Sequence, residues 1–316
     1  MRLTKTLSIL MALTLTASCG IKPDLPDQTP FTGGISEGDF SLEYRWTVGG
    51  VTDMVVGRDS GIFYVIQDAD SLGIYPAYRR ANATLEGRQL FEGLIEPSLL
   101  AEGRDYDRRL WVYDRGDGAV KGFDGNEFLD ALPILMEFTD PDWQDIVAIA
   151  ADDESYVFVA DRGPNLIYRY RVEGDATDAE IFADGTLSWT SQGGGATVRD
   201  LAFADGNLLL LTDVLLTLQI LDTETGPQDP AVFVYLDGFI DEPGLITGAG
   251  SDIFVTDRAD TTVWVMNWEL QLEKAVRINA LDDDPALLDP VAMTVNEGKL
   301  YVADPELGKI LDYEKR

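Results

Sequence analysis

The sequence predicts an all-β protein: a six-bladed β-propeller whose blades are four-stranded antiparallel sheets. Two observations support this prediction. A short phrase of β-forming residues occurs six times, and its copies end 47, 47, 52, 44 and 47 residues apart. A period of this length with several strands per unit is typical of propeller blades. The copies are Tyr64-Val65-Ile66-Gln67, Trp111-Val112-Tyr113-Asp114, Phe158-Val159-Ala160-Asp161, Leu210-Leu211-Thr212-Asp213, Phe254-Val255-Thr256-Asp257 and Tyr301-Val302-Ala303-Asp304.

Further strand segments surround each copy in a constant order. A first strand precedes the phrase, the phrase is the second strand, and turn residues separate it from a third and a fourth. The first strands are expected at 54–56, 98–101, 146–150, 201–203, 245–247 and 291–295. Third strands are expected at 119–123, 166–170, 218–221, 262–267 and 309–313, and fourth strands at 134–138, 180–182, 231–235 and 274–278.

The two ends of the repeat array complement each other. The last repeat lacks a fourth strand, whereas an extra segment with alternating apolar and polar residues precedes the first repeat at 40–46. We expect this N-terminal strand to complete the last blade, because closure pairs strand edges that would otherwise stay open. Residues 40–316 would then form one domain.

Three repeats carry a longer shared pattern, at 159–170, 255–266 and 302–313, which begins Val-Ala-Asp or Val-Thr-Asp and continues into the third strand. These segments resemble NHL-type propeller repeats, and the resemblance extends over nearly all of 40–316. It implies six blades but no particular activity, because such propellers include lyases, lactonases, receptors and scaffolds. The first and fourth repeats depart from the pattern, with Gln67 in place of Asp and Leu215-Leu216-Thr217 in place of a polar turn.

The first residues have the features of a targeting segment. Arg2 and Lys5 precede an apolar stretch that is too short to span a bilayer, and small residues lead to Cys19, the single cysteine of the chain. This segment resembles the lipobox of bacterial lipoproteins, which implies a signal peptide at 1–18 and a lipid on Cys19. An ordinary secretory signal is the alternative. Gly20 in place of Asp implies an extracytoplasmic protein anchored in the outer membrane, and 19–39, rich in Pro, Asp, Thr and Gly, is expected to be a flexible tether.

The chain is strongly acidic, with 56 Asp and Glu against 24 Lys and Arg and a net charge of −32. Nucleic acid is therefore not an expected partner, because phosphates need a basic surface. Solubility in a salty medium is the favoured explanation of the charge. Binding of divalent cations or of a basic partner is the alternative. We expect a monomer that contacts the membrane through its lipid.

A first set of carboxylates precedes the predicted inner strands, one in each repeat. If those strands line a central channel, the carboxylates would surround its mouth, where a hard cation such as Ca²⁺ would relieve their repulsion. Turn chemistry, with the carboxylates directed at backbone amides, is the alternative. The set is Asp53, Glu96, Asp145, Asp200, Glu242 and Asp289.

A second set of carboxylates ends the repeated phrase, and its constant position predicts a structural role as acceptor for turn amides. Arginines follow three of these residues and are expected to pair with neighbouring carboxylates, or else to bind an anionic or carbohydrate ligand. The carboxylates are Asp114, Asp161, Asp213, Asp257 and Asp304, and the arginines are Arg115, Arg162 and Arg258.

Two loops between blades have unusual compositions. Trp143 stands among acidic residues, and the glycine-rich stretch around Gln192 lengthens one repeat interval to 52. Loops of this kind on a rigid scaffold often carry recognition, so both residues are candidates for a binding face.

The chain contains no histidine, and lipidation would occupy its cysteine. This excludes a Ser-His-Asp triad, a histidine base and a Cys nucleophile. Lactonases of the gluconolactonase kind hold a divalent metal, but their Pro-Asn-Gly motif is absent, and Val198-Arg199-Asp200-Leu201 stands in its place. The sequence therefore favours a non-enzymatic module that binds an envelope protein or a small ligand. A lactonase-like, metal-dependent hydrolase is the alternative.

Overall fold

The computed structural model divides by its internal contacts into Met1–Gly34 and Ile35–Arg316, and only parts of the second unit are described below. No described residue belongs to a helix that is long and apolar enough to cross a membrane. The residues described are 40–47, 50–56, 62–66, 72–75, 93–103, 109–124, 133–152, 156–174, 180–187, 196–222, 226–227, 232–236, 238–250, 252–259, 262–268, 270, 272–277, 289–296 and 298–315.

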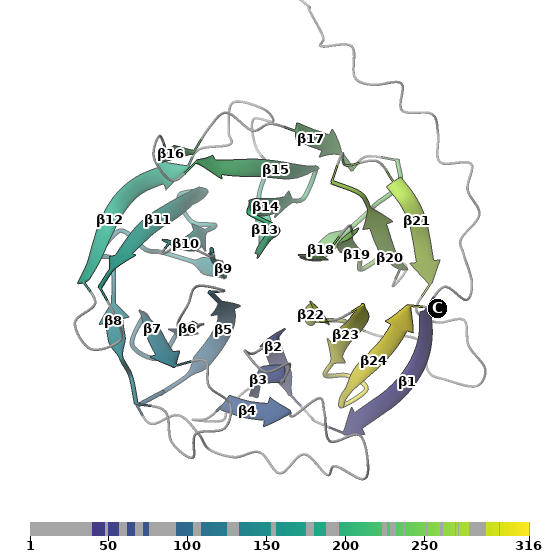
Figure 1. Ribbon diagram of the computed structural model, residues 1–316, viewed down its shortest axis with the longest axis horizontal. Coiled ribbons are helices and arrows are strands. Elements are labelled where there is room, and N and C mark those ends of the chain that lie inside the picture. Colours follow the sequence, from purple (N-terminus) through teal and green to yellow (C-terminus); the bar gives the residue numbers. More distant parts are fainter. Residues whose placement is uncertain are drawn as a thin grey trace, which may run out of the picture. The chain divides into compact units, whose positions relative to one another are not determined.

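The strands of these residues form six antiparallel sheets, each of which runs outward from an inner strand (Figure 1). The first sheet has three described strands and the next two have four each. The three sheets comprise β2 (Val51–Val56), β3 (Ile62–Ile66) and β4 (Leu72–Tyr75); β5 (Pro97–Glu102), β6 (Arg109–Asp114), β7 (Ala119–Asp124) and β8 (Met136–Phe138); and β9 (Ile146–Ala151), β10 (Tyr156–Asp161), β11 (Leu166–Glu173) and β12 (Glu180–Leu187).

The other three sheets follow the same plan. In the fourth sheet β16 and β17 both pair with β15. The three sheets comprise β13 (Val198–Ala204), β14 (Asn207–Thr212), β15 (Leu215–Asp222), β16 (Gly226–Pro227) and β17 (Val232–Tyr235); β18 (Pro243–Ala249), β19 (Asp252–Asp257), β20 (Thr262–Met266) and β21 (Leu272–Arg277); and β22 (Ala292–Asn296), β23 (Lys299–Asp304), β24 (Lys309–Lys315) and β1 (Phe40–Thr47).

The N-terminal strand completes the last sheet, as the sequence predicts. β1 lies antiparallel to β24, with Phe40 opposite Lys315 and Thr47 opposite Lys309. The described part of the first sheet ends at β4, and residues 76–92 lie outside the described residues. Asp205 and Gly206 join β13 to β14 with φ angles of 49° and 76°, the left-handed values that a tight hairpin needs.

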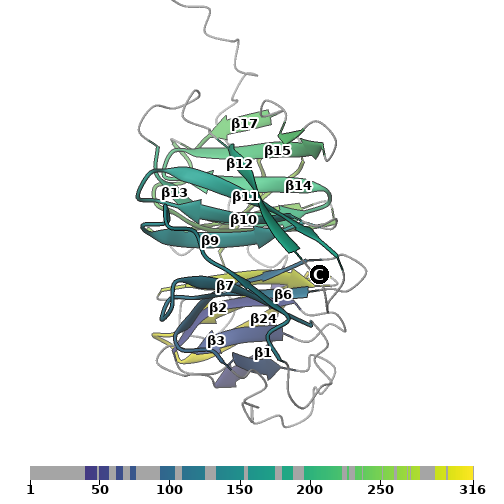
Figure 2. The same cartoon turned by 90° about the vertical axis from the view of Figure 1, so that its left-hand side faces the viewer.

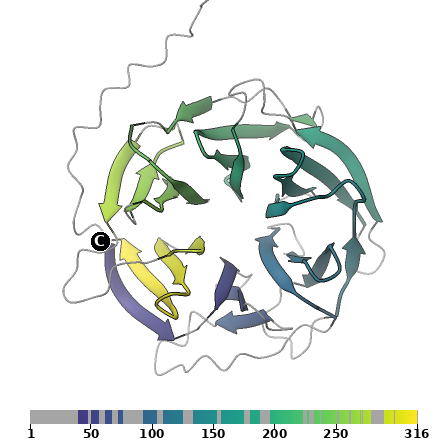
Figure 3. The same cartoon turned by 180° about the vertical axis from the view of Figure 1, so that it is seen from behind.

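The first strands of the sheets meet around a common centre and form a closed cycle. β2 contacts β5, and the contacts continue through β9, β13, β18 and β22 back to β2. Figure 3 shows the same convergence from behind, and in the edge-on view of Figure 2 the sheet β9–β12 faces the viewer. In this cycle β2 and β13 lie opposite each other, three sheets apart in either direction.

The hydrophobic core lies between neighbouring sheets. One cluster joins Phe254, Val263 and Val265 of the fifth sheet to Val302 and Leu311 of the last, and similar clusters fill other spaces between neighbouring sheets. Each such side chain contributes about 1.5–3 kcal/mol when it is fully buried. Packing of this kind fixes each inner strand against its neighbours, so it also fixes the side chains around the channel.

Candidate functional site

Six residues of the inner strands share one register and form what we call the axial ring. Each lies opposite the second residue of its repeated phrase; Asp53, for example, lies opposite Val65, and Asp200 lies opposite Leu211. All six line a cavity of about 170 Å³ at the centre of the cycle. The axial ring consists of Asp53, Leu100, Ile149, Asp200, Ile246 and Met293.

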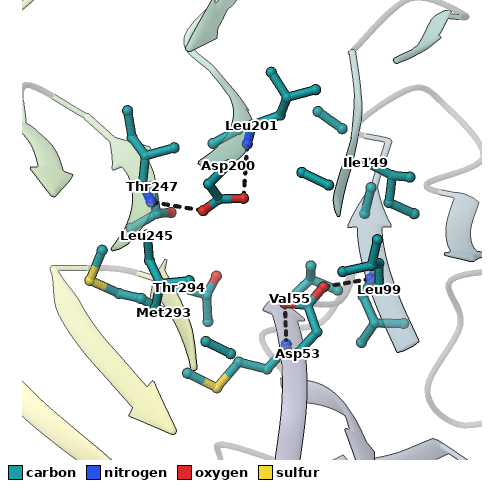
Figure 4. A pocket seen from close by; sticks show the side chains of 18 of the residues that line it. Asp53, Val55, Leu99, Ile149, Asp200, Leu201, Leu245, Thr247, Met293 and Thr294 are labelled. Atoms are coloured by element: carbon teal, nitrogen blue, oxygen red, sulfur yellow. Dashed lines mark hydrogen bonds between the residues drawn. The ribbon is translucent and has the colours of Figure 1, made fainter. Parts of the chain in front are cut away.

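The two aspartates of the axial ring approach the channel from opposite strands (Figure 4). Asp53 accepts hydrogen bonds from the amides of Met54 (2.8 Å) and Leu100 (2.6 Å). Asp200 accepts them from Leu201 and Ile246, both at 2.8 Å. Each carboxylate therefore joins its own strand to the equivalent residue of the next sheet.

Both carboxyl groups are weak acids in this environment. Desolvation raises the pKa of Asp53 to about 8, although its amide hydrogen bonds oppose the rise and the nearby charge of Asp200 adds to it. Desolvation likewise raises the pKa of Asp200 to about 7 against its two amide hydrogen bonds. The other four members of the axial ring are apolar and buried, which is why the wall solvates a charge poorly. Both residues are half-buried and line the channel cavity.

The six carboxylates that the sequence grouped together occupy two different positions. Asp53 and Asp200 lie inside strands and face the channel, whereas the other four precede their strands. The assumption that all six are equivalent is therefore wrong. Asp53 and Asp200 stand at the register position that Leu100, Ile149, Ile246 and Met293 occupy in the other inner strands. The other four carboxylates each lie four residues before that position.

Three of the remaining four form exposed ion pairs with the arginines of the repeats. Arg115 contacts Glu96, Arg162 Nε lies 2.8 Å from Asp145, and an Arg258 guanidinium nitrogen lies 2.6 Å from Asp289. These arginines therefore pair with carboxylates, the first of the two uses expected from the sequence. Glu242, the fourth, directly precedes β18 and is exposed.

The carboxylates that end the repeated phrase hold the turns together. Asp161 accepts hydrogen bonds from the amides of Gln144, Asp145 and Gly163 at 2.7–2.9 Å, and so ties the end of β10 to the segment that leads into β9. All five side chains accept hydrogen bonds from backbone amides, the role expected of them, as the contacts of Asp114, Asp213, Asp257 and Asp304 also show.

Trp143 packs against other aromatic side chains. Its ring lies 5.8 Å from those of Phe138 and Tyr170 and 6.3 Å from that of Tyr113. Its indole nitrogen donates a hydrogen bond to the Tyr170 hydroxyl, which in turn donates to Asp140. The residue is half-buried, so its contacts stabilise the loop and leave only part of it available for recognition.

A larger hollow lies on the side where the segments between sheets enter the inner strands. This mouth pocket measures about 530 Å³. It shares Val147, Arg199, Leu245 and Val291 with the channel cavity, so the two spaces adjoin. Its charged lining residues are Arg162, Arg199, Asp213, Asp241, Glu242 and Arg258.

Arg199 was not among the binding residues predicted from the sequence. A comparison of Val51-Thr52-Asp53 with Val198-Arg199-Asp200 contains the relevant signal, because the same three-residue arrangement occurs three repeats apart. Cys19 and Gln192 lie outside the described residues. No group of three or more His, Cys, Asp or Glu side chains in the described ranges is arranged to hold a metal ion, and calcium binding stays a prediction.

Comparison with solved structures identifies the class of fold. The WD40 β-propeller domain of Doa1 has a TM-score of 0.55 and 12% identity, over 88% of this chain and 97% of that one. A streptogramin B lyase has a TM-score of 0.52 and 12% identity, over 88% and 98%. A catalytically inactive virginiamycin B lyase from Staphylococcus aureus, solved with quinupristin, has a TM-score of 0.51 and 13% identity, over 84% and 80%.

These likenesses show that the protein is a β-propeller. At such low identities they show the fold alone. No protein-family model and no curated protein matches the sequence.

Proposed function

We propose that this protein is a lipid-anchored, extracytoplasmic binding module built on a six-bladed, NHL-type β-propeller. Its contact surface is the side that carries the segments between blades. One observation carries the proposal: a concave pocket of about 530 Å³ with charged walls lies on that side, beside the channel. Pockets of about 300–1,000 Å³ are typical of ligand sites, and recognition on such folds usually occurs at loops on a rigid scaffold.

Binding without catalysis is the better supported use of this pocket. The inactive lyase variant among the similar structures carries alanine in place of a histidine. The present sequence contains no histidine, so the same catalytic group is not available. The charged groups of the mouth pocket are arginines and carboxylates, which serve recognition through ion pairs and hydrogen bonds.

The test combines localisation with partner capture. Cys19→Ser should move the protein from the membrane to the soluble envelope fraction. For capture, the purified domain is cross-linked in envelope extract and compared with Asp241→Lys/Glu242→Lys, which reverses two exposed charges at the mouth pocket. The matched control is Glu137→Lys/Glu180→Lys, which reverses two exposed charges on the outer strands β8 and β12.

We expect the mouth variant to lose most of the cross-linked partner and the outer-strand variant to retain it. Equal capture by both variants would contradict the proposed contact surface. A membrane-bound Cys19→Ser protein would contradict the lipid anchor.

A further inference from the structure

Arg199 owes its position to a β-bulge. Val198 pairs with Thr212 and Asp200 pairs with Leu211, so Arg199 has no residue opposite it. Bulges redirect side chains and are frequent beside binding sites. The equivalent bulged residue of β2 is Thr52, which is short and uncharged. The fourth blade therefore carries a long cationic side chain at a point where the opposite blade carries a small polar one.

The charge of Arg199 is available to a ligand. The side chain is exposed, it lines both the channel cavity and the mouth pocket, and among the described residues it forms no ion pair. The other two arginines of the pocket differ, because Arg162 pairs with Asp145 and Arg258 pairs with Asp289.

The opposite charge is present in the same pocket. Asp241 and Glu242 are exposed, and within the described part of the chain their carboxylates have no ion-pair partner. Their backbone is held in place, because the amides of both residues donate hydrogen bonds to Asp257, at 2.9 Å and 3.1 Å. Asp213, the third carboxylate of the pocket, is half-buried and accepts a hydrogen bond from the amide of Thr197. Among its described lining residues the pocket thus holds one exposed cation and two exposed anions outside ion pairs, on a fixed frame.

We propose that the mouth pocket binds a small zwitterion, an α-amino acid or a short peptide. Arg199 binds its carboxylate, and Asp241 or Glu242 binds its ammonium group. A purely anionic ligand would meet these two carboxylates and a net charge of −32, whereas a purely cationic one would meet Arg199. A zwitterion pairs with both signs at once. This inference rests on the proposed function, because it names the ligand class of that same surface.

Three probes of similar size distinguish the contributions of the ligand's carboxylate and ammonium groups to binding. They are L-alanyl-L-alanine, its N-acetyl derivative, which lacks the ammonium group, and its C-terminal amide, which lacks the carboxylate. Isothermal titration of the intact protein at 0.15 M salt should give measurable binding of the dipeptide, and about tenfold weaker binding of each derivative. Ionic strength at this level screens the general field of the protein but leaves contact pairs largely intact.

Substitutions in the mouth pocket test which residue binds which end of the dipeptide. Arg199→Gln should weaken binding of the dipeptide at least tenfold but should not weaken binding of the amide derivative, which lacks the carboxylate. Asp241→Asn/Glu242→Gln should weaken binding of the dipeptide but not of the N-acetyl derivative, which lacks the ammonium group. The control is Arg115→Gln, which removes an arginine of the same side that does not line the mouth pocket; it should bind as the wild type does. Thermal melts of all variants verify folding.

No binding of the dipeptide at 10 mM would overturn the inference, as would equal affinity of either derivative or wild-type binding by Arg199→Gln. If the dipeptide fails while the Asp241→Lys/Glu242→Lys variant still loses its cross-linked partner, the ligand class is wrong and the binding surface stands. If the dipeptide does not bind and the Asp241→Lys/Glu242→Lys variant also retains its cross-linked partner, the proposed function is contradicted as well.

Discussion

Asp53 and Asp200 occupy two of the six positions of the axial ring, and the other four positions are apolar. A charged carboxylate in such a wall is poorly solvated, yet each one accepts two amide hydrogen bonds, one of them from the next blade. These amides belong to the inner edge of a first strand, where no further strand pairs with them. The two aspartates therefore satisfy edge groups and join the first blade to the second and the fourth to the fifth.

Their raised pKa values predict that stability falls as the pH rises. The folded state holds these protons up to a pH of about 7–8, whereas an unfolded chain releases them near pH 4. The stabilisation is thus complete below pH 4 and is lost as the pH rises through the folded-state values. Between pH 5 and pH 9 we expect the melting temperature of Asp53→Asn/Asp200→Asn to fall less than that of the wild type, by about 2–4 °C or more for a domain of this size.

The control for this experiment is Asp205→Asn, which changes an exposed carboxylate in the turn between β13 and β14. It should follow the wild-type pH profile. Parallel profiles for the wild type and the double variant would show that the channel carboxylates titrate normally.

The position of these two residues in their strands could not be predicted from the sequence. Carboxylates near the inner strands are visible in the sequence, but their register is not. One-residue irregularities occur in β2, β5, β9, β13 and β18, so the spacing between the channel-facing residue and the repeated phrase varies from blade to blade, and the sequence does not show which carboxylate faces the channel. For the same reason the sequence did not single out Arg199.

In the blades whose repeated phrase ends in aspartate, this residue stabilises the β-hairpin of the first and second strands. Asp161 is fully buried and accepts three amide hydrogen bonds. Asp213 is half-buried, and its carboxylate accepts one from Thr197. The fourth blade, whose repeat departs from the common pattern, therefore has the weaker version of this contact.

Alanine variants should reproduce that difference. Asp161→Ala leaves buried amides without an acceptor and should lower the free energy of unfolding by about 3–5 kcal/mol, since hydrogen bonds to charged groups contribute about 1.5–3 kcal/mol each. Asp213→Ala should cost about 1–2 kcal/mol. Urea unfolding followed by circular dichroism measures both, and equal losses would argue against amide acceptance as the role of the repeated aspartate.

Strand positions were largely predictable because each strand repeats with its blade. The second and third strands lie within three residues of their predicted bounds; β14 and β15 begin three residues earlier than predicted, and β11 ends three residues later. β12 spans Glu180–Leu187 and is longer than the predicted 180–182. The prediction was too short because the strand continues through Asp184 and Gly185, which are poor strand formers. Pairing with β11, from Glu173 opposite Glu180 to Ile167 opposite Leu187, overrides that local preference.

The closed cycle of blades depends on one pairing between distant parts of the sequence. β1 and β24 are separated by almost the whole chain, yet they lie side by side in the last sheet. The sequence predicted this closure by elimination, from a missing strand at one end and a spare strand at the other.

Removal of β1 tests the closure. A protein that begins after Thr47 should lose the cooperative transition of one that begins just before Phe40, and its hydrodynamic radius should increase, because β24 is left with an open edge. Analytical ultracentrifugation and thermal melts measure both properties. A compact, cooperatively melting truncated protein would contradict the closure, and replacement of 40–46 by an unrelated strand-forming segment controls for chain length.

The same pairing has a mechanical consequence. Any tension on the residues before Phe40 enters the propeller through β1, whose partner is the last strand of the chain. A pull from the N-terminal side thus acts first on the ladder between β1 and β24, and blades elsewhere in the cycle bear load only after that ladder has parted. The pairing between β1 and β24 is therefore the contact that a force on the N-terminus of such a propeller would break first.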